Sequence, residues 1–218
     1  MRVLIAPDSF GGTLTAVQAA AAIAAGWQRR APDDELTLSP MSDGGPGFVD
    51  VLHASLGGDL LLVTVSDLYG ADTPTAVLMV DRTAYVESAQ ASGLQLSQRR
   101  DPERATSFGV GQMIVAAIEA GASRVMVGLG GSGTNDGGAG LLAALGATSV
   151  PPAALERGAE GLHTLTSVDL SGVRERCGDV ELVLASDVDN PLTGLRGATN
   201  VYGPQKGVTD EGRQRLDA

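Results

Sequence analysis

The chain has 218 residues, of which 43% are hydrophobic and 3% aromatic, and its formal net charge is −11 at pH 7. The hydrophobic content excludes a disordered chain, and the acidic charge excludes a broad basic surface for nucleic acid. No apolar run is long enough to span a bilayer, and a single cysteine, Cys177, cannot form an internal disulfide. We therefore expect a folded, cytoplasmic protein with neither nucleic acid nor a membrane as partner.

The first part of the chain alternates short apolar segments with amphipathic ones. Thr15 and Gln18 have the spacing of a capping box, so a helix should begin there and end near Arg29 and Arg30. The predicted elements are a strand at 2–6, this helix, a strand at 35–39, a helix at 48–56 ended by Gly57-Gly58, and a strand at 60–65. This order is typical of a parallel sheet with helices packed on it.

The pattern changes near residues 66–74, where we place a domain boundary. Segments 75–80 and 83–88 predict a hairpin around Asp81-Arg82. The later elements are a helix at 108–120, a strand at 125–127, a helix at 139–145, a polar and irregular stretch at 147–178, a strand at 181–185 and a helix starting near Thr209. The expected domains are therefore residues 1–70 and 71–218.

Two acidic loops follow predicted strands, Asp8-Ser9 and Asp43-Gly44-Gly45. Ligands of open α/β sheets bind beyond the carboxyl ends of the strands. Two carboxylates there could hold Mg²⁺, which prefers oxygen ligands and bridges to phosphate. The alternative is that each Asp caps the loop or helix that follows it.

The segment from Gly128 to Gly138 is the richest glycine loop and lies between a predicted strand and a predicted helix. Backbone amides in such a loop can approach an anion, and the following helix dipole favours negative charge. Two alternatives are a tight structural turn and the dinucleotide fingerprint of an oxidoreductase, which Gly128, Gly130 and Gly133 satisfy by spacing alone. The candidate binding residues are Gly130, Gly131, Ser132, Asn135 and Asp136.

Near the end of the chain, Asp187 and Asp189 are two residues apart and share one face if the backbone is extended. They could share a cation, and Asn190 could either bind a ligand or form a turn with Pro191. Lys206 is the only lysine and lies between two glycines. It could neutralise charge on a transferring phosphoryl group, or it could simply be a solvated surface residue.

Six segments together resemble the type I glycerate kinase family. They occur in the family's order along nearly the whole chain: Ile5-Ala6-Pro7-Asp8-Ser9-Phe10, Ser42-Asp43-Gly44-Gly45, Ala91-Ser92-Gly93-Leu94, Gly130 to Gly140, Asp187 to Leu192, and Gly203-Pro204-Gln205-Lys206-Gly207. The chain departs from the family pattern at Gly11, where lysine is usual, and at Pro46, where glutamate is usual.

The resemblance implies an α/β protein with a Rossmann-like parallel sheet domain and a second α/β domain inserted in it, both incomplete because the family's C-terminal part is missing. It implies a kinase that uses ATP and Mg²⁺ to convert D-glycerate to 2-phosphoglycerate. The expected catalytic residues are Asp8, Asp43, Asp189 and Lys206, and Asp43, Asp187 and Asp189 are the expected metal ligands.

The same resemblance gives Ser9, Gly44, Gly45, Gly130, Gly131, Ser132, Asn135, Asp136 and Asn190 as the expected cofactor-binding residues. The departures at Gly11 and Pro46 leave a second hypothesis open. In it the chain is an impaired relative that binds a small acid, or a partner protein, without catalysing phosphoryl transfer. Association of identical copies is a further expectation, because an incomplete domain exposes apolar surface.

Overall fold

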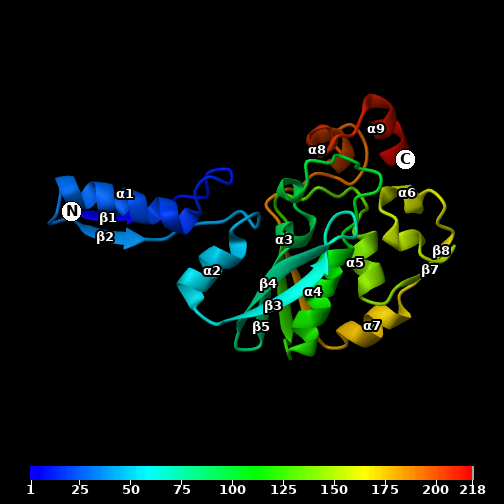
Figure 1. Ribbon diagram of the computed structural model, residues 1–218, viewed down its shortest axis with the longest axis horizontal. Coiled ribbons are helices and arrows are strands. Elements are labelled where there is room, and N and C mark those ends of the chain that lie inside the picture. Colours follow the sequence, from blue (N-terminus) through cyan, green and yellow to red (C-terminus); the bar gives the residue numbers. More distant parts are fainter. Residues whose placement is uncertain (218) are drawn as a thin grey trace.

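A small β-α-β unit begins the chain, whose computed structural model describes residues 1–217. β1 (Arg2–Ile5) pairs in parallel with β2 (Glu35–Leu38), and α1 (Ala16–Arg30) connects them. The predicted capping box is confirmed, because Thr15 and Gln18 each accept a hydrogen bond from the backbone N–H of the other. Figure 1 shows the unit extending away from the rest of the molecule.

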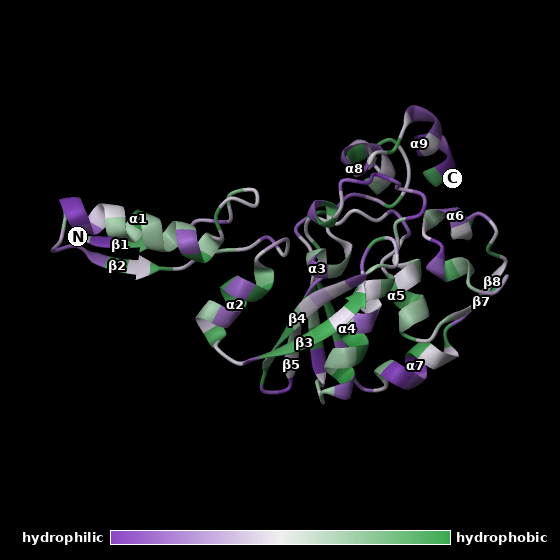
Figure 2. Ribbon diagram, in the orientation of Figure 1, coloured by the Kyte–Doolittle hydropathy of each residue, from purple (hydrophilic) through white to green (hydrophobic). Residues whose placement is uncertain are grey.

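Apolar side chains of this unit remain in contact with solvent. Leu4 on β1 is 67% exposed, and Phe10, Leu38 and Met41 are exposed as well. Two strands and one helix are too few to bury both faces of the sheet. Figure 2 shows the hydrophobic residues of α1 and β1 in this extended part.

The central sheet has five strands in the order β3-β4-β5-β6-β9, and its first three strands are antiparallel while β5, β6 and β9 run parallel. The strands are β3 (Asp59–Ser66), β4 (Asp72–Val80), β5 (Thr83–Glu87), β6 (Arg124–Gly128) and β9 (Glu181–Ala185). The predicted hairpin around Asp81 is confirmed, and Asp81 adopts a positive φ of 51°.

The expectation that β3 continues a parallel sheet with the first two strands is wrong. β3 pairs with β4 along its whole length, because the connecting turn closes on itself. The Asp67 carboxylate accepts hydrogen bonds from the N–H groups of Tyr69 and Ala71. Residues 67–71 are therefore a hairpin turn inside the central sheet, and strand pairing changes between β2 and β3.

Helices pack on the central sheet, and residues of both the helices and the strands form the hydrophobic core. α4 (Phe108–Glu119) and α5 (Ala139–Ala144) pack against each other, and α4 lies on β3, β4 and β5. Glycine permits this closeness: a Cβ at Gly109 would come within 1.8 Å of the Ser66 carbonyl oxygen. α2 (Phe48–Leu56) contacts β4 and β5, and α3 (Ala89–Ser92) follows β5 directly. The main core residues include Val77, Val86, Met113, Ile114, Val125 and Val127.

Residues 147–178 are more ordered than their sequence predicts. They contain the antiparallel pair β7 (Thr148–Val150) and β8 (Ser167–Asp169), the 3₁₀ helix η2 (Ala154–Glu156), α6 (Ala159–Leu162) and α7 (Ser171–Cys177). The prediction of an irregular stretch is wrong because elements of three to seven residues are too short to show a period. A further 3₁₀ turn, η1 (Leu94–Leu96), lies before α4.

Two short helices form the end of the described chain. α9 (Asp210–Leu216) begins at the predicted Thr209 cap. The predicted loop at Gly203–Gly207 is instead the end of α8 (Ala198–Lys206), with Pro204 inside the helix and Gly207 closing it at a φ of 93°. The mixed α/β class is confirmed, and among residues 1–217 we find no helix long and apolar enough to cross a membrane.

Candidate functional site

Two glycine loops interlock where the small β-α-β unit meets the central sheet. The loop between β2 and α2 brings Gly44 and Gly45 against Gly128 and Gly130 at the end of β6. The Gly130 N–H donates to the Gly44 carbonyl oxygen at 3.1 Å. A Cβ on Gly130 would lie 2.5 Å from both the Cα and the N of Gly45, so only glycine fits there. The structure thus brings together two motifs that lie far apart in the sequence.

Two further segments join the same place. The Leu129 N–H donates to the Ala185 carbonyl oxygen at the end of β9, at 3.1 Å. The segment after β5 forms an antiparallel bridge with the loop, in which the Gly133 N–H donates to the Ser92 oxygen at 2.7 Å and the Leu94 N–H to the Gly131 oxygen at 3.0 Å. The carboxyl ends of β5, β6 and β9 therefore share one edge, where ligands of such sheets bind.

These contacts divide the predicted anion-binding amides into two groups. The N–H groups of Gly130 and Gly133 are occupied by carbonyl oxygens of the protein. Within residues 1–217, the N–H groups of Gly131 and Ser132 have no hydrogen-bond acceptor. Gly131 also has a φ of 73°, a conformation that glycine adopts at little cost. If the loop holds an anion, Gly131 and Ser132 are the amides available to it.

Lys206 reaches this loop from α8. Its Nζ donates to the Thr134 carbonyl oxygen at 2.6 Å and lies 3.4 Å from the Ser132 hydroxyl. Burial lowers the pKa of the Lys206 ammonium, and the charge of Asp136 partly offsets this effect. The hypothesis of a solvated surface lysine is therefore wrong, since the amine is largely buried and points at the glycine loop.

Two polar atoms close to this loop lack partners. The Asn135 Nδ2 and the Ser88 Oγ are both buried, and neither has a hydrogen-bond partner among the described residues. Ser88 follows β5, and its N–H donates to the Gly128 carbonyl oxygen. A buried donor without an acceptor costs about 1–3 kcal/mol, so such groups are concentrated where a ligand or water completes them. Asn135 was predicted from the sequence, whereas Ser88 carries no local signal.

Asp136, in contrast, has a structural role. It is 2% exposed and its carboxylate accepts hydrogen bonds from the N–H groups of Ser107, Gly138 and Gly140 and from the Ser107 hydroxyl. These four bonds tie the start of α5 to the start of α4. The carboxylate therefore has little capacity left for a ligand, and its contribution to the site is to hold the glycine loop.

The loop that carries Asp8 and Ser9 approaches the α2 end of the site. Asp8 is exposed and accepts a hydrogen bond from the Ser9 N–H at 2.6 Å. Ser9 lines a pocket of about 180 Å³ together with Pro46, Gly47 and Asp50. Pro46, one of the two departures from the family pattern, thus faces the loop that carries the other departure, Gly11.

The three predicted metal ligands do not form a ready-made metal site. Asp43 is exposed and accepts from the Gly45 N–H, while Asp187 and Asp189 are exposed in the turn after β9. Within residues 1–217, no three His, Cys, Asp or Glu side chains are grouped so as to hold a metal ion. Any ion here would need a further ligand, such as a phosphate oxygen.

Asn190 connects this turn to the helix that carries Lys206. Its side-chain Nδ2 donates to the Arg196 carbonyl oxygen at 3.0 Å, and its Oδ1 accepts from the Tyr202 hydroxyl at 2.7 Å. Tyr202 lies one turn before Lys206 on α8. Asn190 therefore anchors α8 to the turn beyond β9, in addition to any ligand contact predicted for it.

Glu87 is a buried charge that the sequence analysis missed. It ends β5, is 5% exposed, and its Oε2 accepts hydrogen bonds from the N–H groups of Gly47 and Val49, both at 3.2 Å. It thereby fixes the first turn of α2 and, with it, the Gly44-Gly45 loop. Nothing in its local sequence distinguishes Glu87 from an exposed residue at a strand end.

We expect Glu87→Gln to reduce the pH dependence of the free energy of unfolding. Burial raises the pKa of the Glu87 carboxyl above its ordinary 4.5, so stability is fully present below that value and is lost as pH rises through the folded-state pKa. Glutamine keeps an acceptor for both N–H groups without the charge. Urea unfolding at about pH 5 and about pH 8 measures the difference.

The control is Glu87→Ala, which also removes the carboxyl and leaves both N–H groups without an acceptor. It should show the same reduced pH slope as Glu87→Gln and be about 1–3 kcal/mol less stable than that variant at both pH values. An unchanged pH slope in Glu87→Gln would contradict the assignment of a raised pKa to this carboxyl.

Comparison with known proteins places this geometry in a family. The sequence model described as the glycerate kinase family matches residues 3–218. The chain is 43% identical over 223 residues to a glycerate kinase of Bacillus subtilis (strain 168) and 39% identical to a glycerate 2-kinase of Escherichia coli (strain K12). Both alignments cover 100% of this chain and 58% of the relative, so the chain spans little more than half of the relatives' length.

A solved structure shows the same fold. A crystal structure from Salmonella typhimurium LT2, described as a glycerate kinase 2, superposes with a TM-score of 0.83 at 39% identity. The superposition covers 100% of this chain and 60% of the other. Since the family's sequence model extends over nearly the whole chain, this chain belongs to the glycerate kinase family.

Proposed function

We propose that the protein to which this chain belongs transfers the γ-phosphoryl group of ATP to glycerate and forms 2-phosphoglycerate. The main support for this proposal is that three groups lie together at one edge of the sheet: Gly44-Gly45, the backbone N–H groups of Gly131 and Ser132, and Lys206. The relatives named glycerate kinase support this substrate, and the one named glycerate 2-kinase supports the position of transfer. The cytoplasmic location and self-association expected from the sequence stay predictions.

In the proposed reaction a glycerate hydroxyl attacks the γ-phosphorus, the bond from that phosphorus to the β–γ bridging oxygen breaks, and ADP leaves. Such a transition state needs positioning and neutralised charge more than covalent help. We assign charge neutralisation to Lys206 and anion binding to the N–H groups of Gly131 and Ser132. Asp8, Asp43 and Asp189 are the candidates to accept the hydroxyl proton.

Mg²⁺ fits this chain only as an ion bound jointly with ATP. It is commonly held by one or two carboxylates plus phosphate oxygens, and Asp43, Asp187 and Asp189 are exposed where they could supply such a ligand. When bound, the ion would neutralise phosphate charge. The described residues alone do not provide a three-carboxylate cage.

A phosphorus NMR assay with ATP, Mg²⁺ and D-glycerate tests the proposal. We expect ADP and 2-phosphoglycerate to appear together, in equal amounts, and only when glycerate is present. Glycerate that binds in calorimetry without any ATP turnover would instead favour the second hypothesis, a small-acid binding protein, which the departures at Gly11 and Pro46 keep open.

A further inference from the structure

A second, larger pocket lies outside the residues assigned above. It has a volume of about 410 Å³ and opens between the β3–β4 turn, the segment that leads into α4, and the η2–α6 region. The charged and aromatic residues of its lining are Tyr69, Arg99, Arg104, Glu156, Arg157 and Glu160. None of these residues contacts the Gly128–Gly138 loop through a hydrogen bond within residues 1–217, and none belongs to the predicted phosphoryl-transfer site.

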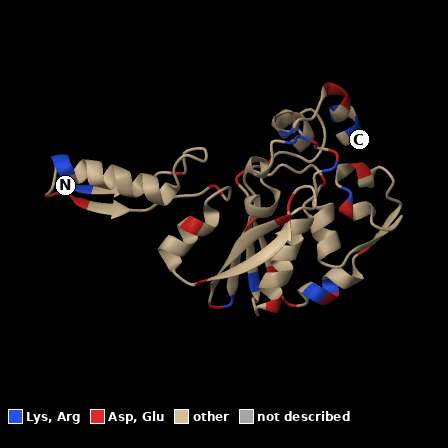
Figure 3. Ribbon diagram, in the orientation of Figure 1, with Lys and Arg blue, Asp and Glu red and all other residues tan. Residues whose placement is uncertain are grey.

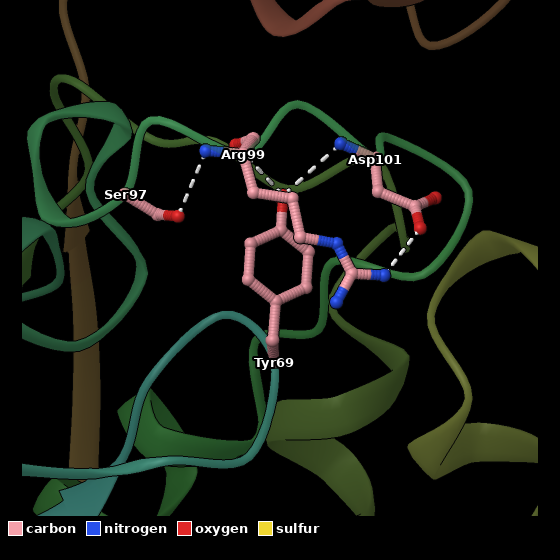
Figure 4. A network of polar contacts seen from close by, with 4 residues as sticks. All are labelled: Tyr69, Ser97, Arg99 and Asp101. Atoms are coloured by element: carbon pink, nitrogen blue, oxygen red, sulfur yellow. Dashed lines mark hydrogen bonds and ion pairs between the residues drawn. The ribbon is translucent and has the colours of Figure 1, made fainter.

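Arg99 is held in place before any ligand arrives. Its guanidinium lies 4.4 Å from the centre of the Tyr69 ring, and its Nη2 donates to the Asp101 carboxylate at 2.6 Å (Figure 4). The Tyr69 hydroxyl donates to the Arg99 carbonyl oxygen and accepts from the Asp101 N–H. Stacking and ion pairing together fix the plane of the guanidinium, which lowers the entropy lost when an anion binds.

The other two arginines leave donors available. Arg157 uses Nη2 for an ion pair with Glu160 at 2.9 Å. Arg104 has no ion pair within residues 1–217 and is exposed to solvent. A guanidinium carries five N–H donors, so at most a few of the fifteen around this pocket are used by the protein.

This cluster contrasts with the rest of the molecule. The chain has a net charge of −11, yet three of its fourteen arginines line one pocket. Figure 3 shows basic and acidic segments close together over the loops near α6, α8 and α9. Guanidinium groups match phosphate oxygens in pairs, so three arginines from two segments around one pocket are an arrangement that phosphate recognition uses.

We propose that this pocket binds a small hydroxylated organic phosphate. Its phosphate group would lie between Arg99, Arg104 and Arg157, and its hydroxyl groups would donate to Glu156, which has no ion pair within residues 1–217. Glu156 and Glu160 add negative charge that disfavours a large polyanion such as ATP. The proposal does not depend on the proposed kinase reaction, because binding here is measured without ATP.

Calorimetric titration with glycerol 3-phosphate tests this assignment at low ionic strength. We expect a dissociation constant of about 1 mM or below, an increase of about tenfold in Arg104→Gln, and an increase of about threefold in Glu156→Ala, where the acceptor for the ligand's hydroxyl groups is lost. If Glu156 only repelled the phosphate, Glu156→Ala would bind more tightly instead. Arg30→Gln, an exposed residue on α1 outside the pocket, is the matched control and should bind as the wild type does.

Three results would overturn the proposal. The first is no binding at about 10 mM of the probe. The second is equal binding of inorganic phosphate, which would remove the role of the hydroxyl groups. The third is loss of binding in Lys206→Met, which would place the phosphate at the glycine loop instead. Circular dichroism of each variant confirms that it is folded, so a loss of binding reports on the pocket.

Discussion

Lys206→Met should strongly slow phosphoryl transfer while the protein stays at least as stable. Removing a single preorganised charge from a transferring phosphoryl group costs about 100-fold to 1000-fold in turnover. The amine is buried against the Thr134 carbonyl oxygen, and keeping this cation away from water destabilises the folded protein. Methionine has a similar length and no charge. Turnover from ADP release and the midpoint of thermal unfolding are the two measurements.

The pH dependence of stability gives an independent check on this lysine. Burial lowers the pKa of Lys206 below its ordinary 10.5. Between the lowered and the ordinary value the unfolded chain binds more protons than the folded one, so stability rises with pH through that window. Lys206→Met should lose this rise. If the variant keeps both the rise and turnover within about twofold, or about 0.4 kcal/mol, the role assigned to Lys206 is wrong.

The matched control for this variant is Gln205→Met. Gln205 is the preceding residue on α8 and is exposed, so the same hydrophobic side chain is introduced without touching the glycine loop. Its turnover should equal that of the wild type.

Because Lys206 is the only lysine of the chain, acetylation of lysine gives a second test: ATP present during the reaction should slow modification at this position.

Elements with strong local signals were predictable from the sequence. The capping box of Thr15 and Gln18, the turn at Asp81 and the cap at Thr209 all form as predicted, because each depends on residues within one turn of one another. The Gly203–Gly207 segment was predicted wrongly since Gly and Pro usually interrupt helices. In the structure the Val208 N–H donates to the Gly203 carbonyl oxygen at 2.9 Å, and a Cβ on Gly203 would lie only 3.1 Å from the Val208 side chain, so glycine fits this helix end.

The types of residue in the candidate site were predictable from the sequence, but the role of each residue was not. The sequence alone cannot show that the Asp136 carboxylate accepts four hydrogen bonds from within the protein. It also cannot show that the Gly130 N–H donates to the Gly44 carbonyl oxygen. Nor can it show that Glu87 caps the start of a helix about forty residues before it, a contact made only after folding. These are contacts between distant segments, which carry no local pattern.

Gly130→Ala should disrupt the site through a single methyl group. The new Cβ would lie 2.5 Å from the backbone of Gly45, and backbone atoms cannot move aside as a flexible side chain does. Forcing an atom into a packed contact costs about 1–3 kcal/mol, and here the strain separates the two loops that position the proposed phosphate site. We therefore expect a loss of that size in the free energy of unfolding, together with loss of turnover.

The comparison variant is Gly26→Ala in α1. The nearest atom to its Cβ would be the Arg29 guanidinium at 3.8 Å, which is ordinary contact with a movable side chain. Alanine should stabilise this exposed helix by about 0.5–1 kcal/mol, so the two glycine variants change stability in opposite directions. If Gly130→Ala instead keeps wild-type stability and turnover, the loops are not in direct contact. The convergence of Gly44-Gly45 with Gly130, on which the proposed transfer site rests, would then be lost.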